Sequence, residues 1–199
     1  MGRQKEFCVE QALGKALEVF WERGFEGASL SDLTDAMGIT RPSLYATYGN
    51  KEELFRKALA LYDACYMSFL PAALGEPTAV SVVEKILEGF VILATNSQHP
   101  RGCLGTNGAL ACSTAADPIK VELVRRRGLF EASLKKRLQR AQDDGDLPAD
   151  ASPADLARFV MAMTSGISVQ AAGGASRSSL RRVADIALRG LPAKAPAEA

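Results

Sequence analysis

The sequence has no long uninterrupted run of apolar residues. None approaches the roughly 18 residues that a membrane-spanning helix requires, so no membrane span is expected. The N-terminal segment carries the charges Glu10, Lys15 and Glu18, which break up any apolar core of a secretory signal. The net charge is only +1, which argues against a protein that coats nucleic acid by bulk positive charge. We expect a cytoplasmic protein with an ordinary buried core.

Side chains suited to catalysis or metal binding are also scarce. His99 is the single histidine, and no Ser, Cys or Asp partner accompanies it in a catalytic motif. Four cysteines occur, none of them in a Cys-x-x-Cys pair: Cys8, Cys65, Cys103 and Cys112. These patterns predict no enzyme, no bound metal and no cofactor, with thiols kept reduced in the cytosol. For His99, beside Pro100, we expect a surface or loop-anchoring role.

Strand-like alternation is missing as well. Apolar residues recur every three or four positions, which predicts an all-α fold. The first helix carries an apolar stripe from Leu13 to Trp21 and is expected to end at Gly24, and Pro71 is expected to end the helix that starts near residue 51. The later helices are expected at about 30–36, 40–48, 51–69, 78–97, 104–115, 117–143, 153–172 and 176–190.

Two short helices joined by a tight turn lie near the N-terminus. Ser29 and Asp32 form a capping-box pattern at the start of the first. Gly38 supplies the turn, and Thr40 caps the second helix, with Pro42 tolerated in its first turn. Their size and spacing are those of a helix-turn-helix, although two short helices of an ordinary bundle remain the alternative.

The second short helix is rich in side chains that can hydrogen-bond, and we expect them to be largely exposed. Its tyrosines can lie against sugar and phosphate, Arg41 can reach a guanine edge, and Lys51 can meet a phosphate. Pro42 either stiffens the start of the helix or contacts a thymine methyl. The candidate DNA-binding residues are Ser29, Thr40, Arg41, Pro42, Ser43, Tyr45, Thr47, Tyr48 and Lys51.

The N-terminal segment is acidic overall. Residues 1–58 contain eight Lys or Arg and nine Asp or Glu, a net charge of −1. A DNA-binding surface here must therefore concentrate its cations on one face. The candidates for that face are Arg3, Lys5, Arg41 and Lys51. We expect few direct phosphate ion pairs and modest non-specific affinity.

Residues 38–54 read GITRPSLYATYGNKEEL, which closely resembles the signature of the tetracycline-repressor (TetR) family. The end of the first helix, from Phe20 to Phe25, and the approach to the next, Ala28 to Leu30, fit the same pattern. The resemblance is specific over roughly residues 8–60 and looser over the last two helices.

This resemblance implies a three-helix helix-turn-helix domain at 1–50 and a larger helical ligand-binding and dimerisation domain at 51–191. The tail at 192–199, rich in Ala and Pro, is expected to be disordered. It implies a transcriptional regulator, a repressor released from a palindromic, double-stranded operator by a small-molecule inducer. An enzyme with a helical fold, or an adaptor bundle that uses the helix-turn-helix for protein contacts, remain the alternatives. Salt-dependent DNA binding would separate the repressor from both.

Members of that family hold ligands between the helices that follow the helix-turn-helix. The candidate ligand-binding residues are Tyr62, Tyr66, Phe69, Phe90, Cys103, Asn107, Leu110 and Phe130. Tyr66 and Asn107 are the preferred polar contacts. Residues at this helical spacing are equally consistent with a plain core.

The stretch around Cys103, PRGCLGTN, resembles a segment of TetR relatives that sense electrophiles or oxidants. His99 or Arg101 could lower the pKa of the Cys103 thiol and make it reactive. A small apolar core residue is the alternative, because free cysteine is commonly just that. Whether Cys103 or Cys112 is a sensor stays open at this point.

Small residues crowd the last two helices, where they would allow close helix approach. Together with the apolar residues beside them they predict a homodimer through residues 153–190, with packing inside one chain as the alternative. The basic clusters 125–127 and 135–137 are expected to be a solvated helix face with Glu122 and Glu131 as four-residue partners.

Overall fold

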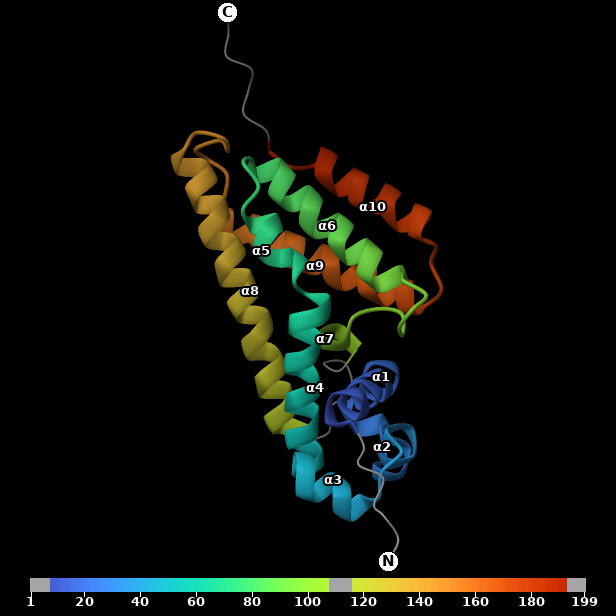
Figure 1. The fold of residues 1–199 in the computed structure, drawn as a ribbon. Helices are drawn as coiled ribbons and strands as arrows, with labels where there is room; N and C mark the ends of the chain where they lie inside the picture. Colours follow the sequence, from blue (N-terminus) through green and yellow to red (C-terminus); the bar gives the residue numbers. More distant parts are fainter. Residues whose placement is uncertain (1–7, 108–115, 193–199) are drawn as a thin grey trace, which may run out of the picture.

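The computed structural model describes residues 8–107 and 116–192 (Figure 1). These residues form helices and loops with no strand, so the all-α prediction is confirmed. The helices are α1 Val9–Gly27, α2 Leu30–Met37, α3 Arg41–Tyr48, α4 Lys51–Tyr66, α5 Phe69–Leu74, α6 Ala79–Thr95, α7 Leu104–Asn107, α8 Asp117–Asp143, α9 Pro153–Ala172 and α10 Arg177–Arg189. In the part of the chain described, no helix is both long enough and apolar enough to cross a membrane. Apart from residue 192, the expected tail lies outside the described residues.

Helix α1 is kinked where the sequence predicted that it would end. Gly24 has φ 70° and ψ 178°, a conformation open essentially to glycine alone, and helical geometry resumes as far as Gly27. The kink places Phe25 in the core, where its ring lies 5.4 Å from that of Phe55 and 6.3 Å from that of Phe20. Gly24 therefore redirects the helix.

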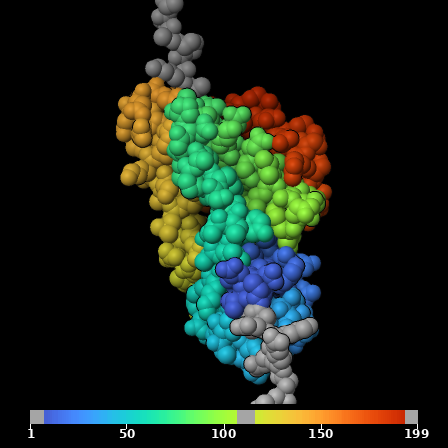
Figure 2. Space-filling view, viewed as in Figure 1, coloured from blue at the N-terminus to red at the C-terminus, as the bar shows by residue number. Residues whose placement is uncertain are grey.

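The N-terminal core is built around α1. Helices α2, α4 and α7 all pack against it, and Trp21 is fully buried among them. Figure 2 shows the segment from α1 to α3, in blue to light blue, gathered at one end of the molecule. The helix-turn-helix thus sits at an end of the protein and away from α10 (Figure 1).

The prediction that one helix runs to Phe69 and ends at Pro71 is wrong. Helix α4 ends at Tyr66, and Met67 leaves helical geometry with φ −102° and ψ 7°. Pro71 lies in the first turn of α5, where the N–H it lacks would have no helical partner. A proline is found both in the first turn of a helix and just after the end of a helix. The position of Pro71 in the sequence therefore did not show whether it ends one helix or begins the next.

The remaining helices form the larger C-terminal part. Helix α6 is its centre and packs against α5, α9 and α10, while α8 packs closely against α9. The long α8 also runs beside α4, the helix that follows the helix-turn-helix (Figure 1). The predicted ranges 117–143 and 153–172 are confirmed by α8 and α9, and proline stands in the first turn of each.

Candidate DNA-binding interface and ligand cavity

The start of α2 is fixed by the predicted capping box. The Ser29 hydroxyl accepts from the Asp32 backbone N–H at 3.0 Å, and the Asp32 carboxylate accepts from the Ser29 N–H at 2.9 Å. The hydrogen bonds from the Ser29 hydroxyl and backbone, and Arg23 at 2.6 Å, lower the pKa of Asp32 to about 2. Gly38, with φ 66°, then ends α2 in the left-handed conformation that the turn requires.

Helix α3 presents a polar face to solvent. Thr40 caps it by accepting from the Ser43 N–H at 3.3 Å, and Ser43 is half-buried. Leu44 is fully buried and holds the opposite face against the core. Tyr45 is 49% exposed, an unusual position for a large aromatic side chain. The exposed residues at this face are Thr40, Arg41, Pro42, Tyr45, Ala46 and Thr47.

Arg41 bridges the two helices of the motif. Its Nη2 donates to the hydroxyl of Ser31 at 2.8 Å, and both side chains are exposed. Ser31 was not among the residues predicted from the sequence, because it lies ten positions away and only the turn brings it back beside Arg41. The contact orients the guanidinium at the surface while leaving most of its N–H groups available.

The expectation that Tyr48 is exposed is wrong. Its side chain is 2% exposed, and its hydroxyl donates to the backbone oxygen of Val9 at 2.7 Å. Tyr48 follows Leu44 by four residues and therefore shares its inward face. Burial raises the pKa of the phenol. Tyr48 thus ties the end of α3 to the start of α1.

Most of the described cations near the exposed face of α3 already have partners within the protein. Arg23 and Arg56 are paired with carboxylates, at 2.6 and 3.3 Å. Lys51 is half-buried with its ammonium 4.6 Å from the centre of the Phe25 ring, and burial lowers its pKa. Arg41 has no carboxylate partner among the residues described, and Arg3 and Lys5 lie outside them. Of the two candidate cations that the structure describes, Arg41 is the one held at the exposed face of α3.

A cavity of about 480 Å³ lies between α4 and the C-terminal helices. Of the predicted ligand-binding residues, four line it: Tyr62, Phe90, Cys103 and Phe130. The Asn107 side chain and Leu110 lie outside the described residues. The lining residues that were not predicted to bind a ligand include Leu59, Asp63, Met67, Leu70, Thr106, Leu123, Arg125, Arg126, Arg127, Met161, Thr164 and Ser165.

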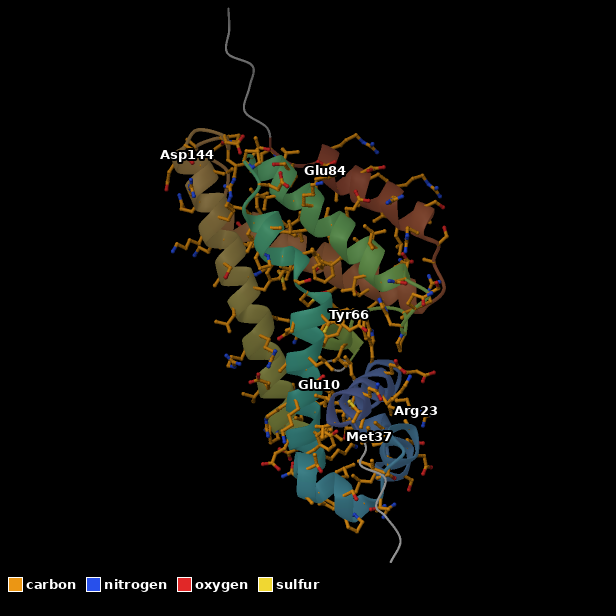
Figure 3. The ribbon with its side chains drawn as sticks, in the orientation of Figure 1. Glu10, Arg23, Met37, Tyr66, Glu84 and Asp144 are labelled. Atoms are coloured by element: carbon orange, nitrogen blue, oxygen red, sulfur yellow. The ribbon has the colours of Figure 1, made fainter. Side chains whose placement is uncertain are left out.

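Tyr66 and Phe69 do not line this cavity, contrary to expectation. The Tyr66 ring packs 4.9 Å from that of Trp21 and 5.1 Å from that of His99; Figure 3 shows it on α4 at the level of α7. Phe69 packs on Gly89 of α6 and lies 5.7 Å from Phe90. Both were assigned to a face of one continuous helix, and the break after Tyr66 turns Phe69 elsewhere. Tyr66 lies before the break and is instead taken up by packing on Trp21 and His99.

The loop before α7 connects the cavity to α1. Cys103 is 5% exposed, and its sulfur accepts from the Tyr62 hydroxyl at 3.2 Å. Burial, with a smaller contribution from Cys103, raises the pKa of Tyr62 well above its usual value. One residue earlier, the Gly102 carbonyl accepts from the indole N–H of Trp21 at 3.3 Å. The same loop thus touches both the cavity and the helix-turn-helix domain.

Neither expected activator of the Cys103 thiol lies against it. His99 stacks on Trp21 with ring centres 4.3 Å apart, which confirms its loop-anchoring role. Arg101 donates to the carbonyls of Ala171 and Ala175 at the end of α9, at 2.8 and 2.5 Å. Cys112 lies outside the described residues.

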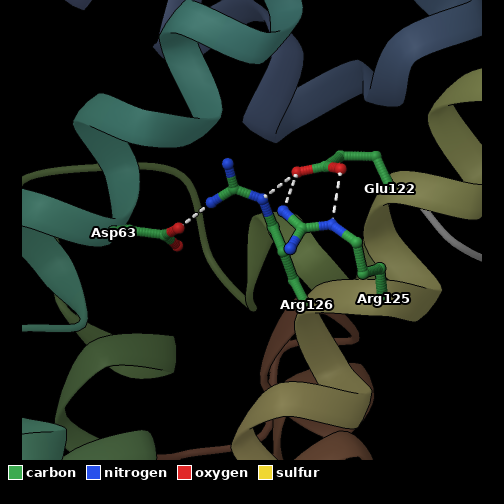
Figure 4. A network of polar contacts seen from close by, with 4 residues as sticks. All are labelled: Asp63, Glu122, Arg125 and Arg126. Atoms are coloured by element: carbon green, nitrogen blue, oxygen red, sulfur yellow. Dashed lines mark hydrogen bonds and ion pairs between the residues drawn. The ribbon is translucent and has the colours of Figure 1, made fainter.

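The first basic cluster of α8 is only partly the solvated face that was predicted. The expected four-residue pair of Arg126 with Glu122 is present at 2.7 Å. Arg126, however, also pairs with Asp63 of α4 across the cavity wall (Figure 4). Glu131 pairs with Arg158 of α9 at 3.5 Å. The sequence could not predict these pairs, because periodicity within α8 does not show which helix packs against it.

Apolar side chains lie exposed on the last two helices. Phe159 and Val169 of α9 are 39% and 47% exposed, and Val183 and Ile186 of α10 are 39% and 62% exposed. Their neighbours Leu180 and Ala184 are buried against α6 and α9 within the chain. The small residues of this region therefore serve internal packing in part, and an apolar outer surface is left over.

The chain matches two family models in succession. Residues 12–58 match the bacterial regulatory proteins of the tetR family, and residues 79–186 match the tetracyclin repressor-like C-terminal domain. The chain is 33% identical over 190 residues to the HTH-type transcriptional repressor ComR of Escherichia coli K12, which covers 94% of this chain and 90% of that one.

Solved structures agree with these matches. A cysteine mutant of the TetR family transcriptional regulator CifR, in complex with a 26-bp operator duplex, is 40% identical with a TM-score of 0.90, covering 96% of this chain and 100% of that one. A putative TetR regulator from Rhodococcus sp. RHA1 is also 40% identical, with a TM-score of 0.63, covering 92% and 98%. With its helix-turn-helix, its all-helical C-terminal part and these matches along most of its length, the chain belongs to the tetR family of bacterial regulatory proteins.

Proposed function

We propose that the protein is a homodimeric transcriptional repressor that leaves its operator when a small molecule enters the cavity beside α4. DNA binding is supported by the exposed polar face of α3, which presents Arg41 and Tyr45 at one end of the molecule. The curated relative ComR is described as a repressor, and CifR was solved on operator DNA. Both relatives support the same role for this chain.

The DNA contacts are assigned to the exposed residues of the motif. Arg41 reads a base edge, while Tyr45 and Thr47 meet the backbone or bases beside it. Ser29, Thr40, Pro42, Ser43 and Lys51 position the motif on the duplex. Tyr48 acts through the fold, by holding α3 against α1.

Two copies are needed to read a palindrome. The exposed apolar side chains of α9 and α10 supply the interface of the proposed homodimer through residues 153–190. The two α3 helices would then enter successive major grooves, roughly 34–36 Å apart. The division into domains at residues 1–50 and 51–191 follows from the same scheme.

Release is assigned to α4. Its first residue, Lys51, follows α3 closely, and its second half carries Tyr62 and Asp63 on the cavity wall. A ligand that favours a different position of α4 therefore changes the position of α3. It need only bind one arrangement more tightly, by about 1–3 kcal/mol.

The test measures binding of the purified protein to DNA flanking its own gene, by fluorescence anisotropy at several salt concentrations. An unrelated duplex of equal length is the control. The expected result is tighter binding to a palindromic site, two chains per site, with affinity falling as salt rises. Equal affinity for both duplexes would overturn the proposal.

The sensor hypothesis for Cys103 is tested separately by alkylation. Because Cys103 is buried on the cavity wall, an adduct there would intrude on the cavity. Release of operator by alkylated protein, absent in Cys103→Ala, supports a sensor. Operator release that does not change when Cys103 is modified rejects it.

A further inference from the structure

An ion-pair network joins α4 to α8 at the wall of the cavity (Figure 4). Arg126 donates from Nε to Glu122 at 2.7 Å and from Nη1 to Asp63. Arg125 occupies both oxygens of Glu122, at 2.9 and 3.0 Å. Asp63 is thus the partner that α4 contributes.

The cavity wall carries more positive than negative charge. Arg125, Arg126 and Arg127 line it, with Asp63 the one carboxylate among the described lining residues. Including Glu122, three guanidinium groups meet two carboxylates, a formal charge of +1. Arg127 is half-buried and has no ion pair within residues 8–107 and 116–192.

The rest of the wall is mostly apolar, and two of its hydroxyls already donate within α9. Thr164 and Ser165 both donate to the Met161 carbonyl, each at 2.9 Å. Phe90 and Phe130, with ring centres 6.4 Å apart, supply aromatic surface. An entering molecule therefore finds surface for an apolar body, and its strongest polar partners are the arginines.

We propose that this cavity binds an amphipathic carboxylate, an apolar aromatic or aliphatic body with one carboxylate that takes the place of Asp63 on Arg126. The inference rests on the proposed function and names the chemical class of its inducer. The group that Arg126 now holds on α4 is itself a carboxylate, so the geometry of the exchange is already present.

Arg126 is suited to such an exchange. Its second terminal nitrogen, Nη2, has no partner among the residues described, so a ligand carboxylate can bind two nitrogens side by side. Burial lowers the pKa of Arg126, so its charged form depends on carboxylates beside it, and a ligand carboxylate can take over from Asp63. Asp63 is 46% exposed and can return to water when displaced.

The exchange also gives a route to release. The backbone of α8 packs closely on α9, so the Asp63–Arg126 pair is a side-chain link between α8 and α4. Losing that link frees the C-terminal half of α4, whose N-terminal half begins directly after α3. By reciprocity, operator binding must weaken carboxylate binding by the same factor.

The experiment is calorimetric titration of the full chain with matched probes. The carboxylates are 4-phenylbutyrate, decanoate and 2-naphthoate, and each is paired with its neutral amide. The variants are Arg126→Met and Asp63→Asn, with Arg140→Met, 77% exposed on the same helix, as the control. Affinity for operator without ligand is measured on the same samples and tests the proposed function independently.

At least one carboxylate is expected to bind about tenfold more tightly than its amide, a preference that Arg126→Met abolishes and Arg140→Met leaves intact. Asp63→Asn should tighten carboxylate binding, because it removes the competitor, an outcome that damage to the fold would not give. Overturning results are amides that bind as well as carboxylates, no binding by any carboxylate, or weaker binding to Asp63→Asn. If the protein binds operator but gives any of these results, the proposed ligand class is rejected and the proposed function stands.

Discussion

At the scale of single residues, two tyrosines three positions apart on α3 differ sharply in exposure. Tyr45 is 49% exposed and Tyr48 is 2% exposed. The prediction that both are exposed overlooked that Tyr48 follows the buried Leu44 by four positions. The hydrogen-bond partner of Tyr48, the carbonyl of Val9, lies 39 positions away in sequence and could not be predicted. Residues whose surroundings are local, such as Ser29 and Gly38, could be predicted, since the capping box and the turn lie within a few positions.

Tyr48→Phe should remove the hydrogen bond to Val9 and leave the ring in place. We expect the free energy of unfolding to fall by about 1 kcal/mol, measured by urea denaturation. Operator affinity should stay close to that of the parent under conditions where both proteins are folded. A large loss of operator affinity at unchanged stability would instead place the Tyr48 hydroxyl on the DNA.

Asp32 gives a pH-dependent prediction. Its pKa falls from the usual 3.8 to about 2 in the folded chain, so its ionised form stabilises the fold above pH 3.8, and this stabilisation is lost as pH falls toward 2. Asp32→Asn should therefore be less stable than the parent near neutral pH. The difference should shrink steadily below about pH 4 in urea titrations. A difference that does not change with pH would show that the Asp32 charge contributes nothing.

At the scale of elements, helix ends were predicted best where capping and proline patterns coincide. Ser152 followed by Pro153 marks the start of α9, because a capping side chain and a first-turn proline both favour it. The break between α4 and α5 was missed, since Met67 carries no stop pattern and Pro71 fits either side of a helix boundary. Phe69 was assigned to the cavity because that break was missed, whereas Tyr66 was misplaced because its partners Trp21 and His99 are distant in sequence.

The kink in α1 gives a prediction with an internal control. Gly24→Ala forces a side chain into φ 70°, ψ 178°, and we expect a loss of about 1–3 kcal/mol in the free energy of unfolding. Gly14, in the same helix, has nothing within 4 Å of an added Cβ. Gly14→Ala should stabilise the protein by about 0.5–1 kcal/mol. Equal effects of the two substitutions in urea denaturation would contradict the role assigned to Gly24.

At the scale of the whole molecule, the account requires two copies joined through α9 and α10. Ile186 of α10 is 62% exposed, and Val121 of α8 is 66% exposed. Ile186→Glu should give monomers in sedimentation and lose operator binding, because a charge would be buried in the interface. Val121→Glu should stay dimeric. A dimer that survives Ile186→Glu and dissociates with Val121→Glu would move the interface to α8.

The family could be predicted from the sequence because its signature is local, within residues 38–54. The ion pair of Arg126 with Asp63 could not be predicted, because the two residues lie 63 positions apart in sequence. Long-range pairs of this kind depend on how the helices pack. They are also the contacts through which a ligand in the cavity can change the position of α3.

The central claim is that the exposed face of α3 reads operator DNA. Its most direct test is the affinity of Tyr45→Ala and Arg41→Ala for the operator, measured by anisotropy, with Arg140→Ala as control. The account predicts a loss of at least about tenfold for the first two, with sedimentation and unfolding unchanged, and no loss for the control. Parental affinity in both α3 variants would contradict the assignment of α3 as the recognition helix.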